Sequence, residues 1–136
     1  MHRLRFFVSA VLVLAAPACL QAADHLVTAG GSAGMVFTPS DLTINVGDTV
    51  TFVNGGGFHN ATSDAGAATA FRCANGCDGD GAGGNGDPSS AAWTATVTFP
   101  VAGSVPYHCE IHQGLGMVGT ITVTPSDLIF RNGFDG

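Results

Sequence analysis

The sequence predicts an all-β protein, a Greek-key β-sandwich of seven or eight short strands with one long glycine-rich loop. The 136 residues include 20 glycines, which suits many tight turns rather than long helices. Apolar and polar residues alternate in several short segments, and this is the period of a strand with one buried face. Turn residues separate these segments at short intervals, which favours a sandwich. A chain of this length is expected to form one domain with one core.

The N-terminal half contains four segments that we expect to be extended, at residues 25–29, 35–38, 42–46 and 49–53. The third is the clearest, because Leu42, Ile44 and Val46 alternate with polar residues and share one face. A turn at Gly47-Asp48 leads into the fourth segment, which delivers the chain to a glycine-rich loop.

Between residues 65 and 92 the alternation disappears, and Gly, Ala, Asp and Asn dominate. We expect a long surface loop there, with one short helical turn at residues 67–71. Strands are expected again at residues 93–99, 104–109 and 118–124. Pro106 has no backbone N–H, so we expect its strand to lie at a sheet edge or to contain a bulge.

The N-terminus has the pattern of a secretory signal peptide, with basic residues at the start, an apolar run at 6–20 and small residues at Ala22 and Ala23. Cleavage after either alanine fits this pattern. A lipid anchor at Cys19 is disfavoured, because the preceding residues include a proline and lack the usual aliphatic residue. We expect a periplasmic or secreted protein made of a signal peptide at 1–23, a domain at 24–125 and a C-terminal tail of open role at 126–136.

The charge of the exported part is strongly negative. Beyond residue 23 the chain carries Arg72, Arg131 and no lysine against ten acidic residues, a net charge of −8. Nucleic acid is therefore not expected as a partner, whereas a basic partner protein is compatible with this surface. The same part has no apolar stretch long enough to span a membrane, and we expect a monomer.

A thiol, an imidazole and a thioether lie within nine residues, at Cys109, His112 and Met117. Proline and glycine disfavour helix on either side, so the three side chains can point into one loop. Cysteine, histidine and a weak methionine ligand suit copper that cycles between two oxidation states. The missing second imidazole is assigned to His59, in a glycine-rich loop after a strand. Structural zinc generally prefers more thiolates or a fourth strong ligand.

This loop resembles that of the plastocyanin group of cupredoxins, which are type 1 blue copper proteins. The match consists of Tyr107-x-Cys109-x2-His112-x4-Met117-Val118-Gly119, with His59-Asn60 upstream. It extends from about Phe37 to Thr124 and favours an exported bacterial type. The resemblance implies a cupredoxin-like Greek-key sandwich that binds one copper ion through His59, Cys109, His112 and Met117.

The resemblance also implies roles for residues around the metal. The backbone N–H of Asn60 is expected to bond to the thiolate, and its side chain is expected to tie the two ligand loops together. The edge of His112 is expected to emerge through an apolar patch that includes Leu115, where electrons leave. His108 stands directly before Cys109, where the plastocyanin pattern has an aromatic residue, and Tyr107 lies one position earlier. We expect His108 to be a solvated surface histidine, and its role stays open.

Two further cysteines and an acidic loop remain. With Cys19 in the signal peptide and Cys109 on copper, Cys73 and Cys77 are expected to form a disulfide in an oxidising compartment. The acidic residues between 78 and 87 invite a calcium site, but the loop lacks the closing Glu of an EF-hand, and calcium binding stays open.

Together these features predict a mononuclear blue copper protein that carries single electrons between transient redox partners outside the cytoplasm. It is not expected to be an enzyme, because the sequence shows no catalytic dyad and no open metal position for a substrate. Two alternatives remain: a copper-binding module for storage or delivery, and an accessory copper domain of a surface assembly. The redox potential and the electron donor and acceptor are left open.

Overall fold

The computed structural model describes residues 15–16 and 21–126. Most of the predicted signal peptide, and all but the first residue of the predicted tail, lie outside the described residues. No helix in the described part is long and apolar enough to cross a membrane.

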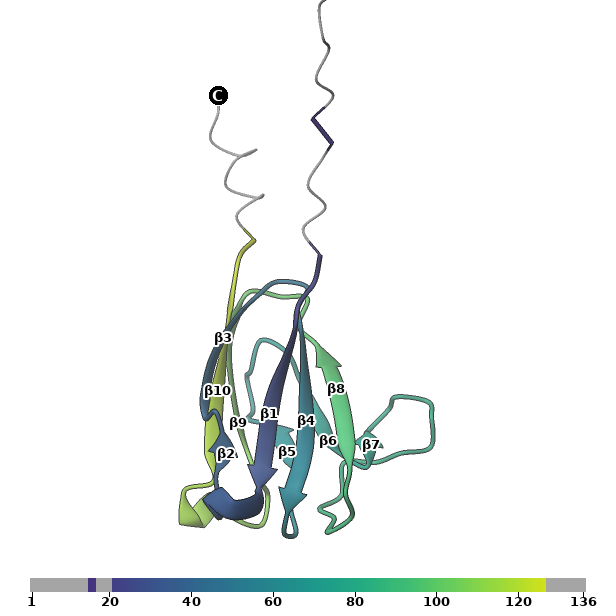
Figure 1. Cartoon of the computed structure of the whole chain (residues 1–136), viewed down its shortest axis with the longest axis vertical. Coiled ribbons are helices and arrows are strands. Elements are labelled where there is room, and N and C mark those ends of the chain that lie inside the picture. Colours follow the sequence, from purple (N-terminus) through teal and green to yellow (C-terminus); the bar gives the residue numbers. More distant parts are fainter. Residues whose placement is uncertain (1–14, 17–20, 127–136) are drawn as a thin grey trace, which may run out of the picture.

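The described chain forms two β-sheets that pack face to face (Figure 1). The first sheet contains, in spatial order, β2 (Phe37–Thr38), β1 (Asp24–Gly30), β4 (Thr49–Gly56) and β8 (Thr94–Thr98). The second contains β3 (Asp41–Asn45), β10 (Val118–Thr124), β9 (Gly103–His108), β5 (Ala61–Ser63), β6 (Arg72–Ala74) and β7 (Gly76–Cys77). Two short 3-10 helices, η1 (Gly31–Ala33) and η2 (Gln113–Leu115), complete these elements. The predicted all-β sandwich is confirmed.

The sheets are mixed rather than purely antiparallel. β1 pairs with β4 in parallel, with Val27 opposite Phe52, and β3 pairs with β10 in parallel, with Ile44 opposite Val123. The remaining pairs are antiparallel. A parallel pair needs a crossover connection. For β1 and β4 the chain makes this crossover by leaving the first sheet after β2, forming β3 in the second sheet, and returning to the first sheet as β4.

Side chains from both sheets meet in one apolar core. Tyr107 lies at its centre, with its ring centroid 4.8 Å from that of Phe37 and 5.5 Å from that of Phe52. Ala95 and Val97 are buried whereas their neighbours in β8 are exposed, as the alternating sequence predicts. This core fixes the strands whose ends carry the site residues.

Three short strands were not predicted, so the described residues contain ten strands instead of seven or eight. β5, β6 and β7 are two or three residues long, too short for alternation to be visible in the sequence. The helical turn expected at 67–71 does not form. Instead, Ala68 N–H donates to Ser104 O at 3.1 Å, and Phe71 N–H donates to Ser63 Oγ at 2.9 Å.

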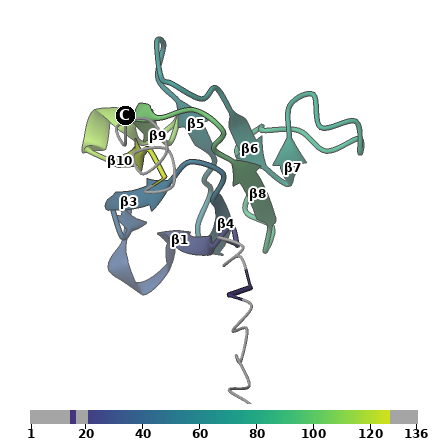
Figure 2. The ribbon, with the colours of Figure 1, turned by 90° about the horizontal axis from the view of Figure 1, so that it is seen from above.

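The region that contains β6 and β7 projects to one side of the sandwich, as both views show (Figures 1 and 2). The structure has the expected disulfide, between Cys73 in β6 and Cys77 in β7. In the loop after β7, the carboxylate of Asp80 accepts hydrogen bonds from Cys77 N–H and Ala82 N–H, so both of its oxygens bond to the backbone of the same loop.

Pro106 lies neither in an edge strand nor at a bulge in the strand pairing, so that expectation is wrong. Its strand, β9, lies between β10 and β5, and Pro106 stands opposite Thr120. The carbonyl of Pro106 accepts a hydrogen bond from Asp64 N–H at 2.8 Å. The N and C=O of one strand residue face the same neighbour. The nitrogen of Pro106, which carries no hydrogen, therefore faces the chain just beyond the end of β5 at Ser63. Strand pairing requires no donor there.

Candidate metal centre

His59 is held in the loop that joins β4 to β5, at the end of the sandwich opposite the described chain ends (Figure 1). Its backbone exchanges two hydrogen bonds with Ser89, at 3.2 and 3.0 Å. Trp93 Nε1 donates to the carbonyl of His59 at 3.2 Å. Asn54 closes the preceding turn by donating to Gly57 O at 2.9 Å. The backbone that carries this imidazole is therefore fixed from several sides.

Glycines make room for the His59 ring. Gly57 has φ +102°, and a Cβ there would lie 2.5 Å from His59 Nε2. Gly30, at the end of β1, has φ +69°, and its Cβ would overlap the same ring and the carbonyl of Gly56. The backbone approaches the imidazole so closely that only glycine fits at these two positions. The role of Gly30 was not predicted, because it lies far from His59 in sequence.

The second ligand loop follows β9 and closes on itself through its backbone. His112 N–H donates to Cys109 O, Met117 N–H donates to His112 O, and Cys109 N–H donates to Met117 O, each at 3.1 Å. Gly116 ends η2 in the left-handed region with φ 87°, which allows the tight return to Met117. Cys109 and Met117 are fully buried, and His112 is half-buried.

Three of the four predicted ligand residues present their donor atoms to one point. Nδ1 of His59 lies 3.1 Å from Nδ1 of His112, and Cys109 Sγ lies 3.8 and 3.6 Å from these two nitrogens. Metal bonds of roughly 2.0–2.3 Å at roughly 120° place donor atoms about 3.5–3.7 Å apart. The triangle therefore fits one metal ion with little movement, and the backbone places Met117 beside it.

The protonation state of His59 favours metal binding. Burial of its ring lowers the pKa of His59, and the neighbouring His112 ring lowers it further, against a smaller opposite effect from a hydrogen bond with the Gly56 backbone. A neutral imidazole is the form that donates a lone pair to a metal. The site therefore holds at least one imidazole ready to bind at neutral pH.

Asn60 connects the two ligand loops, as expected for its side chain. It is completely buried, and its Oδ1 accepts a hydrogen bond from Glu110 N–H at 2.9 Å. Its Nδ2 donates to Gly86 O at 2.9 Å and to Thr62 Oγ1 at 3.1 Å. The expected bond from the Asn60 backbone N–H to the thiolate is not among the hydrogen bonds of the described residues and stays a prediction.

A charged cluster beside the thiolate loop was not predicted. The guanidinium of Arg72 makes two hydrogen bonds to Glu110, at 2.7 and 3.0 Å. It also bonds to Asp78 at 3.1 Å and to Asp87 at 2.9 Å. Arg72 therefore joins the disulfide-bonded loop to the residue after Cys109. No local motif indicates such a cluster, because its members are far apart in sequence.

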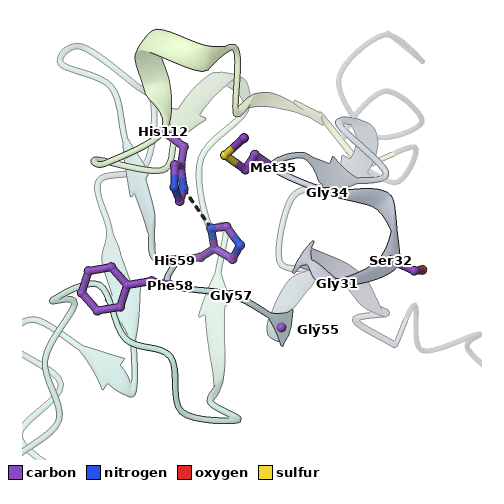
Figure 3. A pocket seen from close by; sticks show the side chains of 10 residues that line it. Gly31, Ser32, Gly34, Met35, Gly55, Gly57, Phe58, His59 and His112 are labelled. Atoms are coloured by element: carbon purple, nitrogen blue, oxygen red, sulfur yellow. Dashed lines mark hydrogen bonds between the residues drawn. The ribbon is translucent and has the colours of Figure 1, made fainter.

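The surface above the imidazoles is an open hollow of about 660 Å³ (Figure 3). Met35, Phe58, His59 and His112 line it, together with several glycines. Leu115, predicted to belong to an apolar patch here, is 67 % exposed. Met35 and Phe58 were not predicted. Met35 begins the apolar run Met35-Val36-Phe37, which indicates a strand rather than an exposed surface, and Phe58 is a single apolar residue in a loop. Both are about half exposed, so the apolar surface is larger than expected.

His108 is not a solvated surface histidine, so that expectation is wrong. Its Nδ1 contacts Asp64 Oδ1, and its side chain is only 16 % exposed. The cause is Asp64, which follows β5 and lies beside β9. The sequence does not show this pairing, because β5 is too short to be predicted.

A β-sandwich with a buried free cysteine and two imidazoles at one end defines a cupredoxin, and comparison with known proteins agrees. Residues 23–124 match the family described as copper binding proteins, plastocyanin/azurin family. Chloroplastic plastocyanin of Chlamydomonas reinhardtii is 39 % identical over 103 residues, which span 74 % of this chain and 68 % of that protein. Plastocyanin of Scenedesmus fuscus is 37 % identical over 102 residues, which span 74 % of this chain and 99 % of that one.

Solved structures of cupredoxins are similar to this chain in fold. Pseudoazurin from Methylobacterium extorquens is 26 % identical with a TM-score of 0.53, covering 78 % of this chain and 80 % of its own. Plastocyanin from Dryopteris crassirhizoma is similar in fold, with a TM-score of 0.55 at 24 % identity, covering 73 % and 99 %. The chain belongs to the plastocyanin/azurin family of copper-binding proteins. Copper is its cofactor, and the cluster fits a single type 1 site.

Proposed function

We propose that the protein is a mononuclear blue copper protein that carries single electrons between partner proteins and is not an enzyme. One copper ion is bound by His59, Cys109, His112 and Met117. The observation that carries this assignment is the triangle of Nδ1, Nδ1 and Sγ atoms, with sides of 3.1 to 3.8 Å, fixed by backbone hydrogen bonds. Family membership supports copper and electron transport.

Copper supplies the one-electron couple when it is bound. The protein's part is to keep the donor atoms in nearly one arrangement in both oxidation states. The hydrogen bonds around His59 and within the 109–117 loop serve this purpose, since they restrain the backbone behind the donor atoms. Burial of Cys109 keeps water from the thiolate, and a dry, rigid site avoids the rearrangement that slows electron transfer.

We propose that electrons enter or leave through His112. Its Nδ1 is one corner of the donor triangle, and the same ring lines the open hollow (Figure 3). Leu115, Phe58 and Met35 give this face an apolar surface. Such a surface suits a brief encounter with a redox partner, and the negative charge of the chain is compatible with a basic one.

We also propose that the protein works outside the cytoplasm, as a domain at 24–125 preceded by a signal peptide that ends at Ala22 or Ala23. The disulfide between Cys73 and Cys77 supports an oxidising compartment. The proposal also includes the expected monomer.

The test is to add Cu(II) to the purified protein and record the intense visible band of a thiolate-to-copper charge transfer. We expect the wild type to turn blue and Cys109→Ser to stay nearly colourless. The matched control replaces the two disulfide-bonded cysteines, Cys73→Ser with Cys77→Ser, and should keep the band. A colourless wild type, or a band that survives in Cys109→Ser, would reject the site.

Storage or delivery of copper is the second candidate. A delivery module must release its metal readily, whereas burial of Cys109 and Met117 favours retention. We expect slow loss of Cu(I) to a competing chelator together with fast electron self-exchange. Fast copper loss with slow self-exchange would favour delivery.

A further inference from the structure

At the end of the sandwich opposite the metal centre, a buried carboxylate binds the start of the folded chain. Asp48 is only 5 % exposed. Its Oδ1 accepts a hydrogen bond from Ala23 N–H at 2.9 Å. Its Oδ2 accepts from Asn45 N–H at 3.0 Å and contacts His25 Nε2 at 2.9 Å. Donors from two separate segments therefore converge on one carboxylate.

Ala23 belongs to the fold through both of its backbone groups. Besides its bond to Asp48, its carbonyl accepts a hydrogen bond from Thr49 N–H at 2.9 Å, which begins the pairing of β1 with β4. Ala22 makes no hydrogen bond within the described part of the chain and is exposed. The ordered interactions thus begin at Ala23, one residue before β1 itself.

We infer that the signal peptide is cleaved between Ala22 and Ala23 and that the new α-ammonium group of Ala23 pairs with Asp48. This inference rests on the proposed export of the protein. A signal peptidase hydrolyses the bond: water adds across it, the carbonyl carbon of Ala22 becomes a carboxylate, and the nitrogen of Ala23 becomes an ammonium. That nitrogen already lies 2.9 Å from Oδ1, so no rearrangement is needed.

Cleavage one residue later would cost the fold both contacts of Ala23. Oδ1 of a nearly buried carboxylate would lose its donor, and Thr49 N–H would lose its acceptor. An unsatisfied buried polar group is costly. Among the hydrogen bonds of the described residues, that from Ala23 N–H is the only one to Oδ1 of Asp48. The small residue required before the cleavage site is present in either case.

Cleavage changes the character of the link to Asp48. In the precursor the donor is a neutral amide with one hydrogen, and in the mature chain it is an ammonium with three. A charge-assisted hydrogen bond is about twice as strong as a neutral one. The mature protein therefore gains an interaction that the precursor lacks, at the strand that begins its first sheet.

The first experiment is to express the whole chain in a secreting bacterial host and determine the N-terminus of the exported protein by mass spectrometry. A chain that starts at Ala23 supports the inference. A chain that starts at Asp24 overturns it and leaves the proposed export intact. An uncleaved chain, or a lipid-modified Cys19, overturns it together with the proposed signal peptide.

The second experiment compares chains 23–136 and 24–136, each released from an N-terminal fusion. We expect the shorter chain to melt at least about 4 °C lower, the shift that 1 kcal/mol produces in a domain of this size. Equal melting temperatures would show that Ala23 contributes nothing and would overturn the inference.

The third experiment uses the absence of lysine, which makes the α-amine the only primary amine of the mature chain. Only the neutral amine is acylated, and its ordinary pKa is about 7.7–8.0, so an ion pair that raises it by one unit slows acylation about tenfold at pH 7. We expect slow acylation in the native 23–136 chain and fast acylation in Asp48→Asn and in urea. Equal rates in all three would overturn the ion pair.

Discussion

The side-chain oxygen of Asn60 accepts a hydrogen bond from Glu110 N–H at 2.9 Å and so joins the loop of His59 to the loop of Cys109. The same side chain donates to Gly86 O at 2.9 Å. One fully buried amide thereby holds three loops together.

We predict that Asn60→Ala lowers the free energy of unfolding of the copper-free protein by about 2–4 kcal/mol, because Glu110 N–H and Gly86 O lose their partner. Urea unfolding measures this change. Thr62→Val is the matched control, since it removes only the hydroxyl that accepts from Asn60. It should cost clearly less, and equal costs would contradict a tie through Asn60 Oδ1.

The Arg72 cluster leads to a prediction about acid stability. The hydrogen bond from Arg72 holds the pKa of Glu110 below its ordinary value and outweighs the opposing effect of burial. A glutamate whose pKa is lower in the folded than in the unfolded chain stabilises the fold at any pH above its unfolded pKa of about 4.3. This stabilisation is lost as the pH falls through the folded pKa. Arg72→Gln should therefore flatten the fall in melting temperature between pH 5 and pH 3.

The size of this effect is modest, on the order of 1 kcal/mol at low salt, because the pair is partly exposed. Glu110→Gln is the companion variant and should flatten the same region of the pH profile. Adding Glu110→Gln to Arg72→Gln should cause no further flattening, whereas adding Arg72→Gln to Glu110→Gln also removes the bonds to Asp78 and Asp87. Further flattening when Glu110→Gln is added to Arg72→Gln would contradict the coupling between Arg72 and Glu110.

A second pH dependence concerns the copper-free protein. Burial, and then the nearby His112 ring, lower the pKa of His59 below 6.5. Because the unfolded chain takes up this proton more readily, stability is highest above pH 6.5 and falls as the pH drops through the folded pKa. Thermal melts of metal-free protein between pH 8 and pH 5 should show this decline. His59→Gln should reduce the slope, and an unchanged slope would exclude His59 as its source.

The sequence could predict those parts of the protein that depend on neighbouring residues. Alternation in Thr94–Thr98 predicts its strand and its buried face, and the spacing of Cys109, His112 and Met117 predicts one ligand loop. These features are local, so they are visible in a short stretch of sequence.

Features made by distant pairing could not be predicted in the same way. Pro106 is tolerated in a central strand only because β5 ends at Ser63, and β5 itself is three residues long. Arg72 reaches Glu110 across 38 positions in the sequence. Such contacts depend on how strands are placed in three dimensions, which composition and periodicity do not specify.

The glycines around His59 allow a final test of the metal centre. Gly57 has φ +102°, and a Cβ there would lie 2.5 Å from His59 Nε2. Gly66 has φ +83° but faces open space, so an added methyl group meets nothing. Gly66→Ala should lose about 1 kcal/mol of stability, because L-residues disfavour positive φ, and Gly57→Ala should lose more, because its methyl group also meets the His59 ring.

Only Gly57→Ala should also disturb copper, because the methyl group must push the imidazole away from its place beside His112 and Cys109. We expect weaker copper binding and a shifted visible band in Gly57→Ala, and a wild-type spectrum in Gly66→Ala. Titration with Cu(II) under identical conditions measures both. If the two variants bind copper equally well, the position of the His59 ring does not depend on the missing side chain at Gly57.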